Sequence, residues 1–464
     1  YKMASSSNAS AGFVDIATLD EIEKYQYGSS QAFTYFVRET RKSTWFTQVP
    51  VLLTKNSGQV GFGRDWSVAI SRSCDYLLHT WLRVKTPSVV LLASNKYGAD
   101  GRIRWTKNFM HNLVREVSIT FNDLVAERLD SYWFDFWAAF TTPASKREGY
   151  DNMVGNIDKL IAPHAPGVPI PERWLNLPLP FFFTRDTGVG LPTAALPYNE
   201  MRINFCFRPW QELLVLENGA PVANTNPYAV PVVGATSDIA VEPVLDNADV
   251  WANYAIVSNE ERERMGCAPR DVLIEQMQTA PRNTFAPELN RQPHYDIRFS
   301  HSVKALFFGV HNTTNKNVRS NYTTASPVPG LTVDNYSPSN SYDPIEYSTL
   351  TYENMDRLTR MGADYYALIN PWYFAPTIPT ETGYHMYSYS LAFYEIDPLG
   401  STNYGKLTNV SMTPYASDAA IVAANGTGAV GSGADYAQKF EFLIMALNTN
   451  IIRISGGVVG FPVL

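Results

Sequence analysis

The residues that could do chemistry do not stand at the spacings that catalytic or metal sites require. The seven histidines include no pair at the i, i+2 or i, i+4 spacing that puts two ligands on one face of a strand or helix. The His-x-His pair typical of jelly-roll metalloenzymes is therefore missing, and we expect neither a metal nor a cofactor. The histidines are His79, His111, His164, His294, His301, His311 and His385.

Two further patterns have explanations that need no catalysis. The segment Gly426–Gly431 satisfies G-x-G-x-x-G, but it lies in an Ala/Gly-rich stretch. The phosphate-binding motif instead joins a strand to a helix within a βαβ unit, so we expect a flexible loop here. Glu260, Glu261 and Glu263 are close in sequence, yet arginines lie among them. We expect a solvated or interdomain ion-pair surface on a charged helix, where each exposed pair contributes little.

The cysteines also argue against catalysis. Cys74 and Cys206 are expected on apolar strands as unreactive core thiols, and with Cys267 they form no CxxC pair. This usage fits a reducing compartment and predicts neither a disulfide framework nor a zinc site. The nucleophile motif G-x-S-x-G does not occur. We predict that the protein is not an enzyme, and we assign no catalytic residue.

The N-terminal residues predict no export signal. Tyr1–Gly12 is small and polar, so we expect a flexible start, with Met3 as the natural first residue. No stretch reaches the roughly 18 uninterrupted apolar residues of a membrane span. Without a signal peptide, the Asn-x-Ser/Thr sequons are expected to stay unmodified. They are Asn8, Asn312, Asn321, Asn335, Asn409 and Asn425.

Composition narrows the class of protein. A chain of 464 residues can form two or three domains with ample cores. Charged residues are 17% and aromatic residues 13%, which indicates a well-packed globular protein. The formal net charge of −7 argues against direct nucleic-acid binding, because that requires clustered Lys and Arg.

Most of the chain has the pattern of short strands separated by Gly and Asn turns. Val117–Phe121 alternates apolar and polar residues and predicts a half-buried strand, and Met201–Phe207 predicts a strand with one apolar face. Residues 162–180 are proline-rich and predict an extended surface connection. The other expected strands are Phe33–Val37, Trp45–Leu53, Trp66–Ile70, Tyr76–Val84, Trp251–Val257, Val272–Met277, Ile297–Val310, Leu350–Tyr352, Tyr387–Phe393, Lys406–Met412 and Phe440–Ile454.

Three helices are expected among these strands. Thr18 and Glu21 have capping-box spacing and predict a helix to about Tyr27. Leu124–Phe140 carries large apolar residues at helical spacing, which predicts an amphipathic helix with a core-facing stripe. Ser258–Gly266 combines a second capping box with acids before arginines and a glycine suited to a left-handed stop. The stripe consists of Leu129, Trp133, Phe136, Trp137 and Phe140.

The sequences on the two sides of Ser258–Gly266 resemble each other. Three pairs of similar segments occur in the same order, two at nearly equal shifts of 229 (299 − 70) and 231 (350 − 119) and a fainter one at 204 (403 − 199). In the first pair, His301 takes the position of Arg72, which favours a turn or hydrogen-bonding role for it. A period above 200 residues indicates a duplicated domain. The pairs are Ile70–Leu78 with Phe299–Phe307, Ile119–Leu124 with Leu350–Met355, and Asn199–Ile203 with Asn403–Leu407.

We therefore predict an all-β protein made of two tandem antiparallel jelly-roll β-sandwiches, a double jelly roll, with a few short helices. The predicted parts are an N-terminal arm with a short helix (1–28), a first jelly roll (29–258), a connecting helix (259–266) and a second jelly roll (267–464). Long loops without secondary structure of their own usually lie at functional or contact surfaces. In the second half these are 311–347 and 414–437.

Several segments spread over nearly the whole chain resemble the major capsid proteins of iridoviruses, most closely those of invertebrate iridescent viruses. More distantly, the chain resembles capsid proteins of other large cytoplasmic DNA viruses. The residues ahead of Met3 depart from the family pattern. The segments that carry the resemblance are Gly12–Ala17, Arg104–Asn112, Leu177–Phe183 with Arg185 and Asp186, Leu196–Glu200, Gly400–Gly405, Asn450–Ile454 and Gly460–Leu464.

The resemblance implies a double jelly roll that forms homotrimers, which give pseudo-hexagonal capsomers and tile the icosahedral shell of a large double-stranded DNA virus. Implied partners are neighbouring trimers, minor capsid proteins and the penton protein. The inner viral membrane is expected to lie close by and to be contacted through minor proteins, and no direct contact with nucleic acid is expected. Implied locations are the virion capsid and, for assembly, the host cytoplasm. The N-terminal arm is expected to face inward, and residues 141–175, 311–347 and 414–437 to form outward loops that knit the trimer.

Two other classes of function stay open at this point. A jelly-roll surface protein could bind host-cell carbohydrate through exposed Tyr and Asn in its loops. A jelly-roll enzyme is disfavoured by the absent ligand pattern. If the protein assembles into trimers in the absence of metal and sugar, the capsid interpretation is favoured over the carbohydrate-binding protein and the enzyme.

Overall fold

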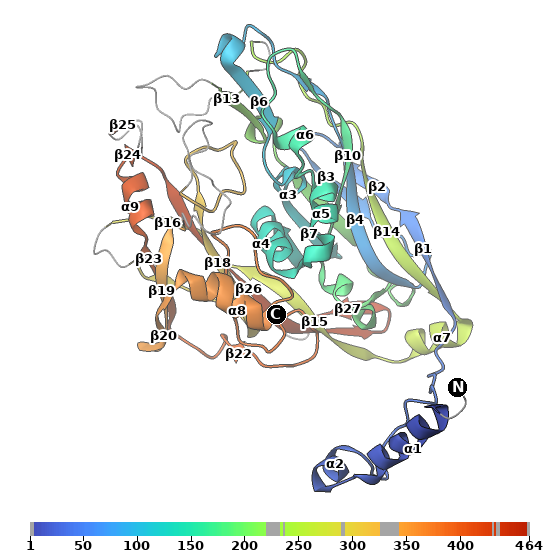
Figure 1. Cartoon of the computed structure of the whole chain (residues 1–464). Coiled ribbons are helices and arrows are strands. Elements are labelled where there is room, and N and C mark those ends of the chain that lie inside the picture. Colours follow the sequence, from blue (N-terminus) through green and yellow to red (C-terminus); the bar gives the residue numbers. More distant parts are fainter. Residues whose placement is uncertain are drawn as a thin grey trace. The chain divides into compact units, whose positions relative to one another are not determined.

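Figure 1 shows a computed structural model of the chain, which describes residues 4–219, 233–234, 237–288, 293–324, 343–428, 431–432 and 437–461. The chain forms two compact units, Tyr1–Trp45 and Phe46–Leu464. The larger unit contains two antiparallel β-sandwiches with a few short helices. The predicted all-β double jelly roll is therefore confirmed.

The small unit differs from three expectations. Its start is the helix α1 (Ala4–Ala17) rather than a flexible segment. The second helix, α2 (Glu21–Gln26), is capped by Asp20, whose carboxylate accepts a hydrogen bond from the Glu21 backbone N–H at 2.8 Å. Thr18 does not form the predicted capping box, because its hydroxyl donates to the Asp15 carbonyl at the end of α1. Phe33–Val37 is irregular and exposed, since no neighbouring strand in the described chain pairs with it.

The first jelly roll consists of two antiparallel sheets, called here sheet A and sheet B. Sheet A has the order β1-β14-β4-β10, and sheet B has the order β2-β3-β12-β7-β8. Apolar side chains between the two sheets form the core. The strands are β1 (Phe46–Leu52), β2 (Thr54–Gly58), β3 (Asp65–Ala69), β4 (Tyr76–Thr86), β7 (Val114–Phe121), β8 (Leu124–Asp130), β10 (Arg173–Pro178), β12 (Met201–Phe207) and β14 (Ala248–Val257).

The second jelly roll repeats this arrangement. Its sheet F has the order β15-β26-β18-β21, and its sheet G has the order β17-β23-β19-β20. A second apolar core lies between sheets F and G. The strands are β15 (Arg270–Thr279), β17 (Tyr295–Asp296), β18 (Ser302–Asn312), β19 (Ile345–Tyr352), β20 (Met355–Gly362), β21 (His385–Ser388), β23 (Val410–Ala416) and β26 (Phe440–Ser455).

The remaining elements are short and mostly lie at sheet ends or in connections. The helices are α3 (Phe109–Leu113), α4 (Ser131–Thr141), α5 (Ala144–Val154), α6 (Asp158–Ile161), α7 (Asn259–Cys267), α8 (Asn370–Phe374) and α9 (Asp418–Ala424). The strands are β5 (Val89–Val90), β6 (Gly101–Trp105), β9 (Pro169–Ile170), β11 (Leu191–Pro192), β13 (Leu214–Asn218), β16 (Asn283–Phe285), β22 (Thr402–Asn403), β24 (Thr427–Gly428), β25 (Gly431–Ser432) and β27 (Val458–Gly460).

The internal echo corresponds to equivalent elements. The first pair leads into β4 and β18, which hold the same place in sheets A and F. The second pair spans the β7–β8 and β19–β20 hairpins. Both hairpin turns hold two residues at positive φ, the first at 50° and 66° and the second at 46° and 66°. This is the geometry of a type I′ turn, in which Asn and Asp are favoured. The turn residues are Asn122 and Asp123, and Glu353 and Asn354.

The third, fainter pair is out of register. Met201 stands opposite Phe121 in sheet B, and Val410 stands opposite Tyr352 in sheet G. Since Phe121 and Tyr352 are equivalent, the true shift for this strand is 209 (410 − 201), not 204. The short match at Asn403–Leu407 arose by chance in the connection that contains β22.

The segment Leu124–Phe140 is a strand followed by a helix, not one continuous helix. Residues Leu124–Asp130 pair with β7 because the tight turn before them folds the chain back. Asp130 then caps α4, accepting a hydrogen bond from the Trp133 N–H at 2.8 Å. Residues Val117–Phe121 of β7 are buried on both faces rather than half-buried, because longer side chains of the flanking strands cover the hydroxyl groups of its serine and threonine. An example is Ser118, which lies between Asn204 and Arg128.

The predicted helix near Ser258 is present as α7, but its ends differ from the prediction. Ser258 holds the N-cap position without a side-chain hydrogen bond. The helix runs through Gly266 to Cys267, and Ala268 follows in extended conformation, so the left-handed stop is wrong. Arg262 fixes the helix instead, because its guanidinium Nε lies 2.7 Å from the Asp75 carboxylate in the first jelly roll.

Two connection predictions need correction as well. The proline-rich segment is extended, but β10 within it is the edge strand of sheet A, with Leu175 and Leu177 buried. Its prolines are tolerated because an edge strand leaves one row of backbone groups unpaired. The expected loop 414–437 contains the end of β23 and the helix α9, capped by Ser417. Residues 325–342 of the other expected loop, 311–347, lie outside the described residues.

Candidate functional site

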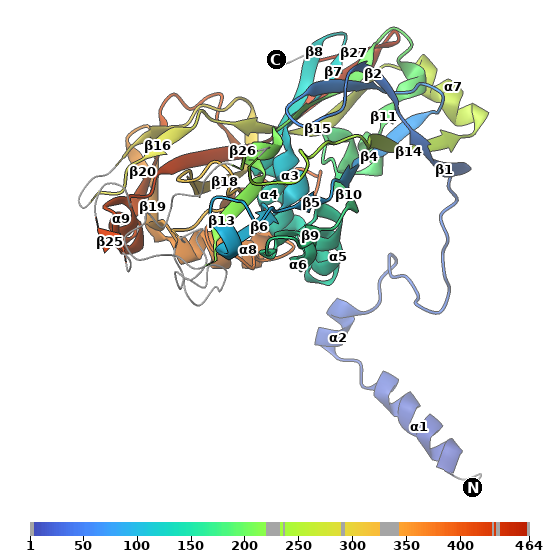
Figure 2. The ribbon, with the colours of Figure 1, turned by 90° about the horizontal axis from the view of Figure 1, so that it is seen from above.

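The most developed constellation of side chains lies where the two jelly rolls meet. Helix α4 of the first roll places aromatic rings against sheet F of the second. The Phe307 ring centroid is 5.4 Å from that of Trp133 and 5.6 Å from that of Phe140, and both pairs are fully buried. Figure 2 shows α4 between the strands of the two rolls. The predicted aromatic stripe is therefore core packing, which confirms that interpretation.

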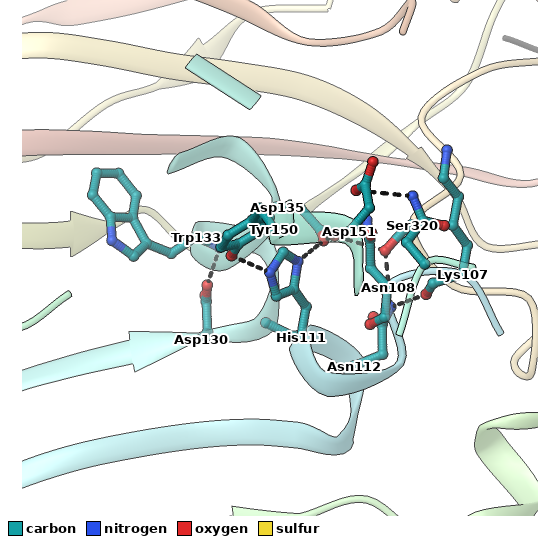
Figure 3. A network of polar contacts seen from close by, with 12 residues as sticks. Lys107, Asn108, His111, Asn112, Asp130, Trp133, Asp135, Tyr150, Asp151 and Ser320 are labelled. Carbon is teal, nitrogen blue, oxygen red and sulfur yellow. Dashed lines mark hydrogen bonds and ion pairs between the residues drawn. The ribbon is translucent and has the colours of Figure 1, made fainter. Parts of the chain in front are cut away.

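A buried polar network accompanies this aromatic packing (Figure 3). Asp135 of α4 is its centre: one carboxylate oxygen accepts hydrogen bonds from the hydroxyls of Ser320 and Tyr322, each at 2.8 Å. The other oxygen accepts one from the Asn108 side-chain amide at 3.2 Å and lies 2.7 Å from His111 Nδ1. Four donors around one carboxylate compensate for the loss of water that burial imposes.

The network continues to helix α5. His111 Nε2 lies 2.6 Å from the Tyr150 hydroxyl, so both ring nitrogens are engaged. Burial raises the pKa of Tyr150 and of Tyr322 far above its ordinary value, and the nearby Asp135 charge adds to the rise. Both phenols therefore keep their protons and remain donors. The network joins α3, α4 and α5 of the first roll to the segment after β18 of the second.

An Asp–His–Tyr series resembles a proton relay, but here every polar atom of Asp135 and His111 already has a protein partner. The cavity beside Asp135 and His111 measures about 80 Å³, which is small compared with the several hundred Å³ of a substrate pocket, and a larger cavity of about 570 Å³ is lined by Tyr150 but by neither Asp135 nor His111. The arrangement is suited to fixing the two rolls in one orientation.

A second buried cluster joins the rolls through charges. Lys304 of β18 donates to the Glu275 carboxylate of β15 and to the Glu395 carbonyl. Arg185 of the first roll has its Nε 4.0 Å from Glu275, and its guanidinium stacks 3.9 Å from the Trp137 ring centroid. A buried charge without a partner is costly, so each ion holds its neighbours in place.

Glu127 of β8 completes the charged cluster. One of its oxygens accepts a hydrogen bond from the Phe182 backbone N–H at 2.8 Å. Burial raises the pKa of Glu127 to about 7, although the charge of Arg185 acts in the opposite direction. This carboxyl group therefore changes its charge near neutral pH, at the contact between the rolls.

The seven histidines do not form a cluster. His79 is exposed on β4, and the buried His311 packs against the rings of Tyr132 and Tyr322, with no hydrogen bond from the described part of the chain to either ring nitrogen. His301 lies at φ 63° and its carbonyl accepts from the Tyr404 N–H, which agrees with the predicted turn role. His385 Nε2 is 2.6 Å from the Asp343 carboxylate, and His294 Nδ1 is 2.7 Å from the Thr413 hydroxyl. Within the described residues, no group of three or more His, Cys, Asp or Glu is placed to hold a metal ion.

The other residues singled out from the sequence lie far from one another. Gly426 follows the helix α9, the reverse of the strand-to-helix order of a phosphate loop, and positions 429–430 of the motif lie outside the described residues. Cys74 lies in the loop before β4 rather than on a strand, because β4 begins at Tyr76. Cys206 is on β12 as expected, and burial raises the pKa of its thiol to about 11, so it stays unreactive at neutral pH.

The glutamates of α7 and the sequons have no common location. Glu260 and Glu263 are exposed, in agreement with a charged helix surface. Asn312 and Asn321 are buried, whereas Asn8, Asn409 and Asn425 are exposed. The sequon at Asn335 lies outside the described residues. None of the described helices is long and apolar enough to cross a membrane.

The two clusters between the rolls were not identified from the sequence. A signal for the charged one was present, since Lys304 interrupts the apolar run Val303–Val310 and Glu275 stands within a predicted strand. A charge inside such a run requires a buried partner. The polar network left no such signal, because Asp135 and His111 occupy ordinary helical positions.

Comparisons with known proteins give the family. A model of the major capsid protein N-terminus matches residues 34–257, and one of the large eukaryotic DNA virus major capsid protein matches residues 261–460. The major capsid protein of Invertebrate iridescent virus 6 is 66% identical over 99% of both chains. That of Lymphocystis disease virus 1 is 50% identical over 99% of both chains.

Solved structures agree at the level of the fold. The capsid protein in the PBCV-1 capsid has a TM-score of 0.71 at 20% identity and covers 93% of this chain and 100% of its own. The Faustovirus major capsid protein has a TM-score of 0.69 at 11% identity, covering 94% and 95%. The protein is therefore a structural component of the virion capsid and not an enzyme. Its double jelly roll and these relatives show that the chain belongs to the major capsid proteins of large eukaryotic DNA viruses, in the iridovirus group.

Proposed function

We propose that three copies of the chain associate into one pseudo-hexagonal capsomer and that these capsomers tile the icosahedral shell. The observation that carries this proposal is the repeated sheet order of the two jelly rolls. Three chains then present six similar sandwiches, which suits a hexagonal lattice. Head-to-tail contacts close into a ring when the rotation between copies allows it.

Native mass tests the trimer. Purified protein is measured by light scattering over a hundredfold concentration range, without metal or sugar. We expect a species near three chain masses. A chain that stays monomeric throughout, with its β circular dichroism spectrum intact, contradicts the proposal.

We further propose that the small unit Tyr1–Trp45 faces the inside of the shell, toward minor capsid proteins and the inner viral membrane behind them. Its exposed apolar side chains support this, because such a surface calls for a partner. Phe13, Ile16, Ile22, Phe36 and Trp45 are all more than two-thirds exposed. Contacts with the penton protein and assembly in the host cytoplasm belong to the same proposal.

Limited proteolysis tests the inward position. The arm of isolated capsomers is expected to be cleaved quickly between α1 and β1, whereas in intact particles it is expected to be protected. Equal cleavage rates in both preparations contradict an inward arm.

We also propose the division into an arm (1–28), two jelly rolls (29–258 and 267–464) and a connecting helix (259–266). The position of α7 between β14 and β15 supports it, since β14 belongs to sheet A and β15 to sheet F. Expression of 29–258 and 267–464 as separate chains tests whether each folds.

A further inference from the structure

Two apolar surfaces of the larger unit lie far apart in sequence. One is the outer face of sheet A, where Trp81 and Trp251 are half-buried and Trp174 is 42% exposed. The other, called here the α8 patch, consists of Leu368, Ile369, Trp372 and Tyr373 and includes the end of the π-helical turn Tyr365–Ile369. Trp372 and Tyr373 are 71% and 72% exposed. Large aromatic residues on a surface mark contact sites.

The pairing of the strands identifies which residues of the second roll are equivalent to those on the outer face of sheet A. Strands β4 and β18 each contain one bulge where they pair with β14 and β26, at Leu78 and at Lys304. Counting from these bulges makes Trp81 equivalent to Phe307, a shift of 226 (307 − 81), so the first sequence pair, at 229, is three residues out of register in these strands. The neighbours across the sheets follow: Trp251 and Pro178 flank Trp81, and Met445 and Met386 flank Phe307.

The two equivalent rows differ in burial. Met445, Phe307 and Met386 are each at most 1% exposed. Helix α4 covers this row, since Trp133 and Phe140 both contact Phe307. In the first roll, Trp251 and Trp81 are half-buried and Pro178 is exposed. A cavity of about 570 Å³ lies against Trp81 and Pro178, with Trp137 and Met153 on its other side.

The helix equivalent to α4 also differs in its surroundings. The hairpin β7–β8 leads into α4, and the equivalent hairpin β19–β20 leads into the π-helical turn and α8. Helix α8 is anchored to its own roll by Asn370, whose side-chain oxygen accepts a hydrogen bond from the Ser388 N–H at 3.2 Å. Trp372 and Tyr373, which follow, are exposed to solvent, whereas Trp133, Phe136 and Phe140 of α4 are buried against rings of the second roll.

We propose that the α8 patch of one copy packs on the outer face of sheet A of a second copy, as α4 packs on sheet F within the chain. This inference rests on the proposed trimer and names its interface. The contact is head-to-tail, because the two surfaces differ, and each copy carries one of each. Three copies related by threefold rotation then satisfy all six surfaces in a closed ring.

Charged residues surround both surfaces. The outer face of sheet A carries Arg83, stacked 4.2 Å from the Trp174 ring centroid, and Lys85, which lies 2.9 Å from the Glu172 carboxylate; Asp249 stands opposite Arg83. The exposed acids Glu346 and Asp364 line a second cavity beside the α8 patch. Opposite charges at the rim of an apolar contact favour the correct pairing of partners.

Substitution of the α8 patch tests the contact. The double variant W372D/Y373D is expected to be monomeric at concentrations where the unchanged chain is a trimer. Its circular dichroism spectrum and melting temperature should equal those of the monomer of the unchanged chain. Because both side chains are exposed, the fold should tolerate the change. W372A and, on the other surface, W81A are each expected to weaken association by tenfold or more, as central aromatic residues do in interfaces. The control is M355D, at an equally exposed position on the β19–β20 turn, which is expected to remain trimeric.

Mixed cysteine variants test the head-to-tail geometry. In a C267S background, W81C and W372C chains with different tags are produced together and treated with a short bismaleimide. We expect a covalent dimer that contains one chain of each kind, and none when either variant is produced alone. Cross-linking within one variant, or none in the mixture, overturns the proposed contact.

The outcomes separate the two proposals. If the unchanged chain is a trimer and W372D/Y373D is also a trimer, the interface is wrong while the trimer stands. If the unchanged chain is a monomer at all concentrations, the trimer and its interface are both wrong.

Discussion

At the scale of single residues, the junction between the jelly rolls combines apolar rings with ionisable groups that are almost removed from water. Glu127 is 3% exposed, and Lys304 and Glu275 are 1% exposed. Burial raises the pKa of Glu127, and the nearby charge of Arg185 opposes that rise. Stability at this junction should therefore depend on pH through a few identifiable residues.

Glu127 should make the protein more stable in mild acid. Its pKa is raised by burial from 4.5 to about 7, so between these values the folded chain binds more protons than the unfolded chain. Stability contributed by this group is complete below pH 4.5 and declines as pH rises toward 7, by about 1.4 kcal/mol per pH unit at most. The variant E127Q should lose this decline and exceed the unchanged chain in stability at pH 8. Urea unfolding at pH 5 to 8 measures it.

The exposed Glu148 supplies the control for this experiment. E148Q should leave the pH dependence unchanged. An E127Q profile parallel to that of the unchanged chain argues against ionisation of Glu127 near neutral pH.

His311 should act in the opposite direction. Burial, with a contribution from Arg319, lowers the pKa of His311 from 6.5 to about 3. Below pH 6.5 the unfolded chain binds a proton that the folded chain does not, so stability falls, by roughly 2 kcal/mol at pH 5. H311F keeps a ring beside Tyr132 and Tyr322 and should reduce this loss. Denaturant unfolding midpoints of H311F and the unchanged chain, measured at pH 5 and pH 7, test this. H79F, at the exposed His79, is the control. If H311F and H79F lose the same stability between pH 7 and pH 5, the assignment to His311 is wrong.

At the scale of elements, α4 connects the two sandwiches, and its position depends on the Asp130 cap, the aromatic rings and the Asp135 network. Each of these alone is a modest interaction. Together they remove the freedom of the rolls to slide, because the network joins α3, α4 and α5 to the second roll.

The network should be sensitive to the loss of one charge. D135N replaces an acceptor oxygen by an amide that faces the donors of Ser320, Tyr322 or Asn108. We expect a loss of about 2–4 kcal/mol in the free energy of unfolding, typical of a broken buried charged hydrogen-bond network. Guanidinium chloride unfolding measures it. D151N, at the rim of the neighbouring cavity, should cost less than about 1 kcal/mol; equal effects of the two substitutions argue against a special role for Asp135.

Sequence patterns identified elements better than their ends and contacts. The strands β4, β12 and β26 were predicted from their runs of apolar residues, because this signal is local. The two hairpins were not predicted, because β8 was assigned to a helix and β20 was not among the expected strands. The error at Leu124–Asp130 has a physical cause: Leu129 and Trp133 fit a helical period, but the positive-φ turn at Asn122 and Asp123 makes the first part a strand. The junction clusters depend on pairs such as Asp135 with Tyr322, which are 187 residues apart, and no local pattern contains that information.

At the scale of the whole molecule, the junction within the chain and the proposed contact between chains should respond differently to concentration. Dilution should dissociate the trimer into folded monomers, because the junction between the rolls is held by one continuous chain. Light scattering and circular dichroism on the same dilution series measure this. Loss of β structure together with mass contradicts it.

The duplicated fold also changes how mutations act on the particle. In a ring of six identical single-sandwich chains, one substitution would alter all six contacts at once. Here the row around Phe307 and the row around Trp81 are encoded separately, so each can change alone. The first row is a buried core of Phe307 between Met445 and Met386. The second row has tryptophans beside Arg83, a composition suited to binding that can be undone. With the proposed interface, the tandem chain therefore carries two versions of one contact, a permanent one within the chain and a reversible one between chains.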